Sequence, residues 1–339
     1  MNNLFECSPK ELVTDGFLEW FITELDADPT TRSPISMFFY TLGLCDSSMD
    51  SIAIDKISRQ EKNTDLIIRY HVNGIKTDAL FENKTYTSTH SGQLKRYKDE
   101  FPGFKYYKYM KLGYIFYQER KDAAQAGYTV IDVYQLKLAL DSVPLNNMLV
   151  NQYREFLGAR FIDVQNKIFR ELVRDNRHSL LEDSHGQAQQ YILSELHHDL
   201  DSQIPYLNFK YAGNKGGTLW TQLDIARRKD AYGSNSEELL FWRIDKRGKG
   251  YYLRLNQYSE IKDANYWPQK KANLQILRNH IEPLMKSKGL VLDKPNNKGM
   301  NESEITILFF EDNHIELIKK HLTDLSIDIY KFYSSYNWV

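Results

Sequence analysis

The sequence contains little cysteine and carries no excess of charge of either sign. Two cysteines, Cys7 and Cys45, occur among 339 residues. They match no metal-ligand spacing and are too few for a disulfide framework. Lysine plus arginine number 44 and aspartate plus glutamate number 45. Without a global basic field, a protein that coats DNA non-specifically is disfavoured, although an enzyme with a local basic groove remains compatible with this balance.

Long apolar runs and targeting signals are also missing. The longest apolar stretch, residues 35–45, is too short and too interrupted to cross a bilayer. The N-terminus lacks the basic and apolar regions of a signal peptide. Hydrophobic residues make up 42% and charged residues 26%, which is typical of a globular protein. We therefore expect a cytoplasmic protein that does not associate with membranes.

The order of elements predicts an α/β protein. Apolar residues at helical spacing indicate a helix over residues 10–25. Strands are predicted at 65–70 and 75–84, a helix at 93–100, strands at 112–117 and 128–134, and a helix from 135. We expect a mixed sheet flanked by helices in residues 1–145. In residues 146–339 we expect an α+β region that binds substrate or a partner, with helices at 151–174, 186–200, 269–288 and 313–322 and strands at 220–226, 239–244, 251–255 and 304–310.

The two predicted strands at 65–70 and 75–84 form a hairpin whose turn fixes its register. They are joined by Asn73-Gly74, a strong signal for a type I′ turn. With these two residues as the loop, each cross-strand pair sums to 147, so Asp65 lies opposite Glu82. Lys84 is two residues beyond Glu82 and shares its face of the sheet.

Two opposed carboxylates with an ammonium beside them suggest a metal site. Like charges opposed across strands repel each other, and a hard divalent cation with oxygen ligands relieves the repulsion. A cation held by two carboxylates keeps positions open for water and for a phosphate oxygen. Lys84 is then placed to stabilise charge in the transition state. The alternative is that these are ordinary charges on an exposed strand, as we expect for Arg69 opposite Asp78.

The motif Asp65…Glu82-Asn83-Lys84, followed by Gln93-Leu-Lys-Arg-Tyr97, resembles the PD-(D/E)XK nuclease superfamily, in the branch with a RecB-like QxxxY helix. The segment that begins at Glu11 is similar to the first core helix of that branch. Thr64 stands where the name of the superfamily has proline.

The resemblance implies a restriction-endonuclease-like fold and a Mg²⁺- or Mn²⁺-dependent nuclease. Asp65, Glu82 and the main-chain carbonyl of Asn83 would bind the metal, and Lys84 would be the catalytic lysine. Gln93 and Tyr97 would support the lysine and contact nucleic acid. Glu11 and Glu61 would be supporting acids, for instance at a second metal. DNA is preferred over RNA on the same grounds, and such proteins often look like bacterial or phage-encoded defence enzymes.

Several other features carry weaker hypotheses. Three basic clusters, at residues 105–111, 227–229 and 246–249, are candidates for phosphate contacts but are better explained as solvated surface. His197 and His198 fit no ligand spacing, and the GNKGG segment lacks the order of a phosphate loop. Two alternatives to an enzyme stay open: a nucleic-acid-binding protein without turnover, and an interaction module. A homo-oligomer or a protein partner is compatible with either.

Overall fold

The computed structural model describes residues 3–7, 11–27, 32–89, 92–145, 147–172, 186–213, 219–233, 235–247, 250–295, 301–309 and 312–338. The chain divides into two compact units, Met1–Asn166 and Lys167–Val339, which are described separately. Within the described segments, no helix is both long and apolar enough to cross a membrane.

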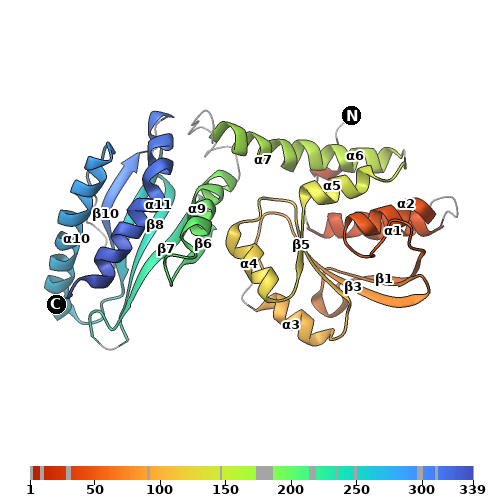
Figure 1. Ribbon diagram of the computed structural model, residues 1–339, viewed down its shortest axis with the longest axis horizontal. Helices are drawn as coiled ribbons and strands as arrows, with labels where there is room; N and C mark the ends of the chain where they lie inside the picture. The colour runs from red at the N-terminus through yellow and green to blue at the C-terminus, as the bar shows by residue number, and fades with distance from the viewer. Residues whose placement is uncertain are drawn as a thin grey trace. The chain divides into compact units, whose positions relative to one another are not determined.

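The first unit is a mixed α/β domain with helices around a five-stranded sheet (Figure 1). Its strands are β1 (Ile52–Arg59), β2 (Leu66–Val72), β3 (Ile75–Lys84), β4 (Tyr106–Lys111) and β5 (Thr129–Asp132), in that order across the sheet. β1, β2 and β3 pair antiparallel, whereas β3, β4 and β5 pair parallel. The helices are α1 (Glu11–Ala27), α2 (Arg32–Thr41), α3 (Gln93–Glu100), α4 (Tyr117–Gln125), α5 (Val133–Asp141) and α6 (Met148–Leu157).

The helices cover both faces of this sheet and bury a separate core on each. On one face α1, α2, α5 and α6 enclose a large core that includes Phe21, Phe38 and Tyr70. On the other face α3 and α4 enclose a smaller core with Ile67, Leu80 and Tyr97. Leu80 and Phe81 are neighbours in β3 and lie in different cores, as the alternation of a strand requires. The predicted α/β class is confirmed.

Several predicted elements shift or are added. The strand predicted at 112–117 is wrong: the strand is β4, six residues earlier, and α4 begins at Tyr117. The repeated lysines and tyrosines of β4 resemble a basic surface segment, but a central parallel strand is covered on both faces. β1 and α4 were not predicted. α4 buries only Glu119 and Ala123 and therefore shows no apolar stripe in its sequence.

The first compact unit extends past the expected boundary at residue 145 and ends at Asn166. The reason is α6, whose Tyr153 is fully buried in the core of the larger face. The Tyr153 ring stacks on Phe17 of α1 at 3.9 Å between centroids and meets Phe5 edge-on at 4.8 Å. After α6 the helical chain continues through a π-helical turn, Gly158–Ile162, into α7 (Asp163–Lys167) and a second π-helical turn, Ile168–Leu172.

The second unit is an antiparallel sheet with helices packed on one face. Its strands are β6 (Asn208–Gly213), β7 (Leu219–Lys229), β8 (Glu237–Arg247), β9 (Gly250–Ser259) and β10 (Glu302–Phe309), in sequential order across the sheet. Its helices are α9 (Gln187–Leu200), α10 (Trp267–Ser287) and α11 (Asp312–Ser335). Trp242 of β8 is fully buried and donates its indole N–H to Ser326 of α11 at 2.8 Å. The four predicted strands in this region are confirmed as β7, β8, β9 and β10, and β6 was not predicted.

Candidate active site

The hairpin has the register that the sequence predicts. Pairs run from Val72 opposite Ile75 to Leu66 opposite Phe81, so the cross-strand sum of 147 holds throughout. The turn residues Asn73 and Gly74 have φ angles of 51° and 81°, the positive values that a type I′ turn requires. Asp65 immediately precedes β2, and Glu82 and Lys84 end β3. The three candidate residues therefore lie at the carboxyl end of a parallel strand, where α/β sheets commonly bind ligands.

The charged side chains of this hairpin are buried and in contact. Glu82 is fully buried and Lys84 is 8% exposed. The Lys84 ammonium donates to Glu82 Oε1, and its Nζ lies 4.0 Å from Asp65 Oδ2 and 4.0 Å from Glu11 Oε2. Since burial of charge is costly unless the charges are paired, ordinary surface charge does not explain this arrangement. The structure overturns that alternative for the hairpin.

The helix α3 brings the expected glutamine and tyrosine to the same site. Gln93 Nε2 donates to Glu82 Oε1 at 2.7 Å and lies 3.1 Å from the Tyr97 hydroxyl. The Tyr97 hydroxyl donates to the carbonyl oxygen of Asn63 at 2.6 Å. Gln93 and Tyr97 are one helical turn apart and thus project from one face. Tyr97 is also part of the smaller core, so it both packs and ties α3 to the turn before Asp65.

The helix α1 supplies a second set of groups from the opposite face of the sheet. Glu11 Oε1 accepts from the backbone N–H of Thr85 at 3.1 Å and from the Thr87 hydroxyl at 2.9 Å. The Asn83 side chain points to this face and donates through Nδ2 to Asp15 Oδ1 at 3.0 Å. The Asn83 backbone N–H donates to Asp65 Oδ2 at 2.7 Å. Asn83 thereby links α1 to Asp65 across the sheet.

Asp15 is the site residue that sequence reasoning missed. It is fully buried, and its Oδ2 has no hydrogen-bond partner among the described residues. The signal was present in the helix pattern. Glu11 and Asp15 continue, at steps of three and four, the buried stripe formed by Leu18, Ile22 and Leu25. A carboxylate on an apolar stripe marks a position where charge is held inside the protein.

The pKa values reflect this concentration of negative charge. Burial, followed by repulsion from Asp65, raises the pKa of Glu82 to about 7. Burial and Asp65 also raise the pKa of Asp15 to about 7, and burial raises the pKa of Asp65 itself. Burial alone disfavours the Lys84 ammonium, but Glu82, Asp65 and Glu11 together outweigh it and raise the lysine pKa. One ammonium thus neutralises only part of the negative charge.

Glu61, expected as a supporting acid, is held elsewhere. Its carboxylate accepts two hydrogen bonds from the Arg69 guanidinium, at 2.7 and 3.0 Å, and Arg69 holds the pKa of Glu61 below its ordinary value. Arg69 faces Asp78 in the register as predicted, but it forms its ion pair with Glu61. The structure brings together Asp65, Glu82, Asn83, Lys84, Gln93, Tyr97 and Glu11, whereas Glu61 is paired away from them.

Glu61 instead helps to hold the turn that presents Asp65. Lys62 and Asn63 in this turn have positive φ angles of 52° and 65°, which are unfavourable for residues with a Cβ. The conformation is fixed from three sides, by the Arg69–Glu61 pair, by the Thr64 hydroxyl on the Glu61 carbonyl at 2.7 Å, and by Tyr97 on the Asn63 carbonyl. The position of Asp65 is therefore set by its surroundings.

The donor set suits a hard divalent cation in chemistry but is not assembled as a metal site. All the candidate ligands are oxygen atoms, as Mg²⁺ and Mn²⁺ prefer, and the buried Glu82 Oε2 lacks a hydrogen-bond partner among the described residues. However, no three His, Cys, Asp or Glu side chains in the described part of the chain are grouped so as to hold a metal ion. The Lys84 ammonium lies among the carboxylates of Glu82, Asp65 and Glu11 instead.

Comparison with protein-family models finds no match, and neither does comparison with curated proteins or with solved structures. The resemblance to the PD-(D/E)XK superfamily therefore rests on the sequence motif alone.

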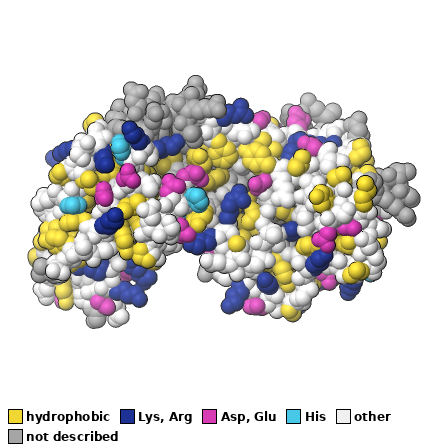
Figure 2. Space-filling model, in the orientation of Figure 1, with side chains coloured by type: hydrophobic (Ala, Val, Ile, Leu, Met, Phe, Trp, Pro, Cys, Tyr) yellow, Lys and Arg dark blue, Asp and Glu magenta, His cyan; other side chains and the backbone are white. Residues whose placement is uncertain are grey.

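The weaker sequence candidates are resolved where the structure describes them. In the cluster at residues 105–111, Lys108 and Lys111 are buried, so surface contacts with phosphates are excluded for these two. Lys111 pairs with the buried Glu119 at 2.7 Å. His197 is buried in α9 and His198 is exposed. Most of the GNKGG segment and the end of the cluster at 246–249 lie outside the described residues. On the face of the molecule in Figure 2, the described acidic and basic side chains are interspersed.

Proposed function

We propose that this protein is a metal-dependent nuclease with a restriction-endonuclease-like fold in its first unit. The observation that carries the proposal is the buried contact of Glu82 with Lys84, with Asp65 and Glu11 each 4.0 Å from the same ammonium and Gln93 bound to Glu82. Burying so many charges at one strand end lowers stability, and proteins tolerate such a loss of stability mainly at functional sites. The motif resemblance gives this site a known chemistry, the hydrolysis of phosphodiesters.

Each residue has a role in this proposal. Asp65, Glu82 and the carbonyl of Asn83 would hold Mg²⁺ or Mn²⁺, which supplies Lewis-acid polarisation of the phosphate and a more acidic water. Lys84 would place its positive charge against the phosphate as negative charge develops there. Gln93 orients the Glu82 carboxylate, and Glu11, through Thr85, fixes the chain just after Lys84. DNA as the preferred substrate, a cytoplasmic location and a role in bacterial or phage defence follow from the resemblance and the sequence alone.

The test is a cleavage assay with matched variants. Duplex DNA, single-stranded DNA and RNA are incubated with the full chain in Mg²⁺, Mn²⁺ or EDTA. We expect metal-dependent cutting that is lost in Asp65→Ala and Lys84→Ala. Glu24→Ala, at an exposed acidic residue of α1, is the control for loss of a carboxylate outside the cluster. Metal-dependent cutting that survives both substitutions would refute the assignment of the site.

A second candidate function is nucleic-acid binding without turnover. One observation favours it: Lys84 is bound directly to Glu82, and no three acidic side chains in the described residues are arranged as ligands. The two candidates differ in how Mn²⁺ binding responds to Lys84→Met. For a metal site, removing the competing ammonium leaves more negative charge and tightens binding of Mn²⁺, measured by calorimetry. A protein without a metal site binds Mn²⁺ in neither form.

A further inference from the structure

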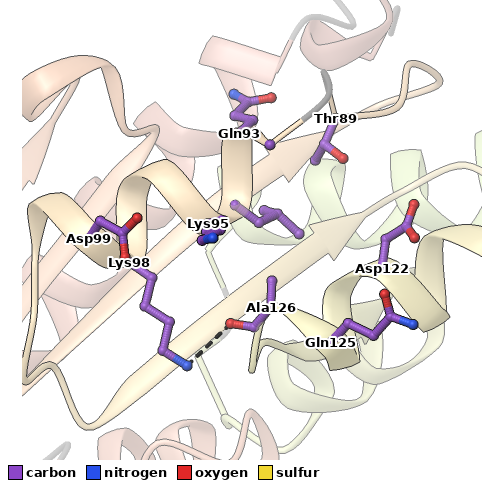
Figure 3. Close-up of a pocket in the computed structure, with 10 residues that line it drawn as sticks. Thr89, Gln93, Lys95, Lys98, Asp99, Asp122, Gln125 and Ala126 are labelled. Carbon is purple, nitrogen blue, oxygen red and sulfur yellow. Dashed lines mark hydrogen bonds between the residues drawn. The ribbon is translucent and has the colours of Figure 1, made fainter.

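A pocket of about 630 Å³ opens between α3 and α4 (Figure 3), and Gln93 of the candidate active site is one of its lining residues. Its walls include Gln93, Lys95 and Asp99 of α3 on one side and Asp122 and Gln125 of α4 on the other. The volume lies within the range of small-molecule sites. None of the roles assigned above to the active-site residues uses this space.

Gln93 connects the pocket to the site. Its side chain lines the pocket, while its amide nitrogen donates to Glu82 Oε1 at 2.7 Å. The pocket therefore begins one side chain away from the buried carboxylates. If the substrate is a nucleic-acid strand, a base bound in the pocket and a phosphate bound at Lys84 would belong to the same strand.

The charges of the pocket disfavour a phosphate as its occupant. Lys95 and Lys98 are balanced by Asp99 and Asp122. The Lys98 ammonium is also engaged, since it donates to the carbonyl oxygen of Ala126 at 3.2 Å (Figure 3) and lies 5.2 Å from the centre of the Tyr107 ring. The Lys98 side chain passes over Gly127, where an added Cβ would lie 2.2 Å from the lysine nitrogen. Lys98 is therefore fixed against the wall of the pocket.

The polar groups of the pocket fit a neutral ring with hydrogen-bond donors. Carboxylate oxygens of Asp99 and Asp122 only accept hydrogen bonds when ionised, whereas Gln125 and Lys95 can donate. Asp122 Oδ1 already accepts from Gln118 Nε2 at 2.6 Å, so Asp122 would meet a ligand through Oδ2. An exocyclic amino group on a base is the usual partner of an acidic side chain in nucleic-acid recognition. A uracil ring presents a carbonyl oxygen where cytosine presents this amino group, and would face the carboxylates with the wrong polarity.

We propose that the pocket between α3 and α4 binds one base of a single strand, next to the phosphate at Lys84, and prefers bases with an amino group. This inference rests on the proposed function, because it takes the substrate to be a nucleic acid. It goes further in naming a base-specific subsite. It also implies that the strand is unpaired at that position, since a base in a duplex is not free to enter a pocket.

The test measures binding in Ca²⁺, an oxygen-liganded cation that can balance the carboxylates, so that the phosphates are not repelled, and the oligomers are checked to be intact after each measurement. The probes are labelled single-stranded homo-oligomers of deoxycytidine and of deoxyuridine, each about twenty nucleotides long, which covers the usual site size of a single-strand binder. They differ only at the base edge, so backbone attraction is the same at one salt concentration. For the full chain, fluorescence anisotropy is expected to show about tenfold tighter binding of the deoxycytidine oligomer.

Two variants locate the preference in the pocket. Ala126→Trp fills the space between the helices and is expected to reduce the ratio of the two affinities to about one, with deoxyuridine binding unchanged. Ala124→Trp, at an exposed residue of α4 that does not line the pocket, is expected to keep the ratio. The double variant Asp99→Asn/Asp122→Asn keeps the pocket volume and is expected to lose the ratio as well, which guards against misfolding of Ala126→Trp.

The outcomes separate this inference from the proposed function. A ratio near one in the unsubstituted chain, or a ratio that persists in both pocket variants, overturns the inference even if the protein cuts DNA in Mn²⁺. Absence of binding to either oligomer also overturns it. A ratio that is lost in the pocket variants supports the inference even if no cleavage is found, and in that case the nuclease proposal alone fails.

Discussion

Replacing Asp15 by asparagine is expected to stabilise the first unit, and to do so more strongly as the pH rises. The Asp15 carboxyl is fully buried beside Asp65, and its pKa is raised from 3.8 to about 7. Between these two values the folded state binds more protons than the unfolded state, so wild-type stability falls as the pH rises through that window. An asparagine side chain at this position cannot ionise, so the substitution removes this loss.

The size of the effect follows from the pKa values. At about pH 5 the folded carboxyl is still protonated, and by about pH 8 it has passed through its folded pKa of about 7. The folded protein keeps its extra proton over about two pH units of this range, and each unit changes the free energy of unfolding by about 1.4 kcal/mol. The stability gain of Asp15→Asn over the wild type is therefore expected to be about 2 to 3 kcal/mol larger at pH 8 than at pH 5. The difference between two pH values is informative because constant costs, such as an unsatisfied amide N–H of about 1 to 3 kcal/mol, cancel.

The assay needs a probe of the first unit alone. Cys45 is buried in the core of that unit, so its reaction with a thiol reagent during urea unfolding, in a Cys7→Ser background, reports unfolding there. Glu24→Gln, at an exposed position of the same helix, is the matched control and should show no such pH dependence. An Asp15→Asn advantage that is equal at both pH values, or that shrinks as the pH rises, would refute the electrostatic description of the site.

Three further predictions concern residues around the site. Gln93→Ala removes the amide that orients Glu82 and should lower the metal-dependent cleavage rate by about 10- to 100-fold, with an unchanged melting temperature. Glu61→Gln breaks a partly exposed pair with Arg69 and should cost about 0.5 to 1 kcal/mol in urea unfolding, while cleavage stays within about twofold because Thr64 and Tyr97 still hold the turn; a large loss of cleavage at unchanged stability would restore Glu61 as a supporting acid. Lys111→Met leaves the buried Glu119 without its ammonium partner, with the Tyr109 hydroxyl and the Phe116 N–H still donating to it, and should cost about 3 to 5 kcal/mol in the same unfolding assay, part of which Lys111→Met/Glu119→Leu should recover.

The hairpin could be predicted because its determinants are local. A type I′ turn at Asn73-Gly74 sets the register of every following pair, and the observed pairs agree from Val72 to Leu66. Residue alternation then places Glu82 and Lys84 on one face and Asn83 on the other. The position of Gln93 relative to Glu82 was not available from local rules, since it depends on how α3 packs on the sheet. It entered through the resemblance alone.

The wrong and missing predictions concern features whose determinants are not local. β4 was misplaced because its lysines suggest a solvated surface, and only the neighbouring strands and helices show that Lys108 and Lys111 are inside. Asp15 was not predicted because the stripe of α1 is defined by its hydrophobic members, and a carboxylate among them gives no sign of its partners. Glu61 was assigned to the site by position in a motif, whereas its partner Arg69 is determined by the fold. Each error concerns a charged residue whose environment is set by distant parts of the chain.

The burial of these charges bears on which proposed function is correct. A protein that only presents a surface to a partner gains nothing from holding Asp15, Asp65 and Glu82 where their pKa values are raised. The cost is avoidable, because apolar residues of similar size would stabilise the same fold better. A site that takes up a cation, as proposed, would need this excess of negative charge, and Lys84 would reduce the repulsion in the absence of the cation. The proposed function would therefore account for the cluster, whereas the stability of the sheet does not.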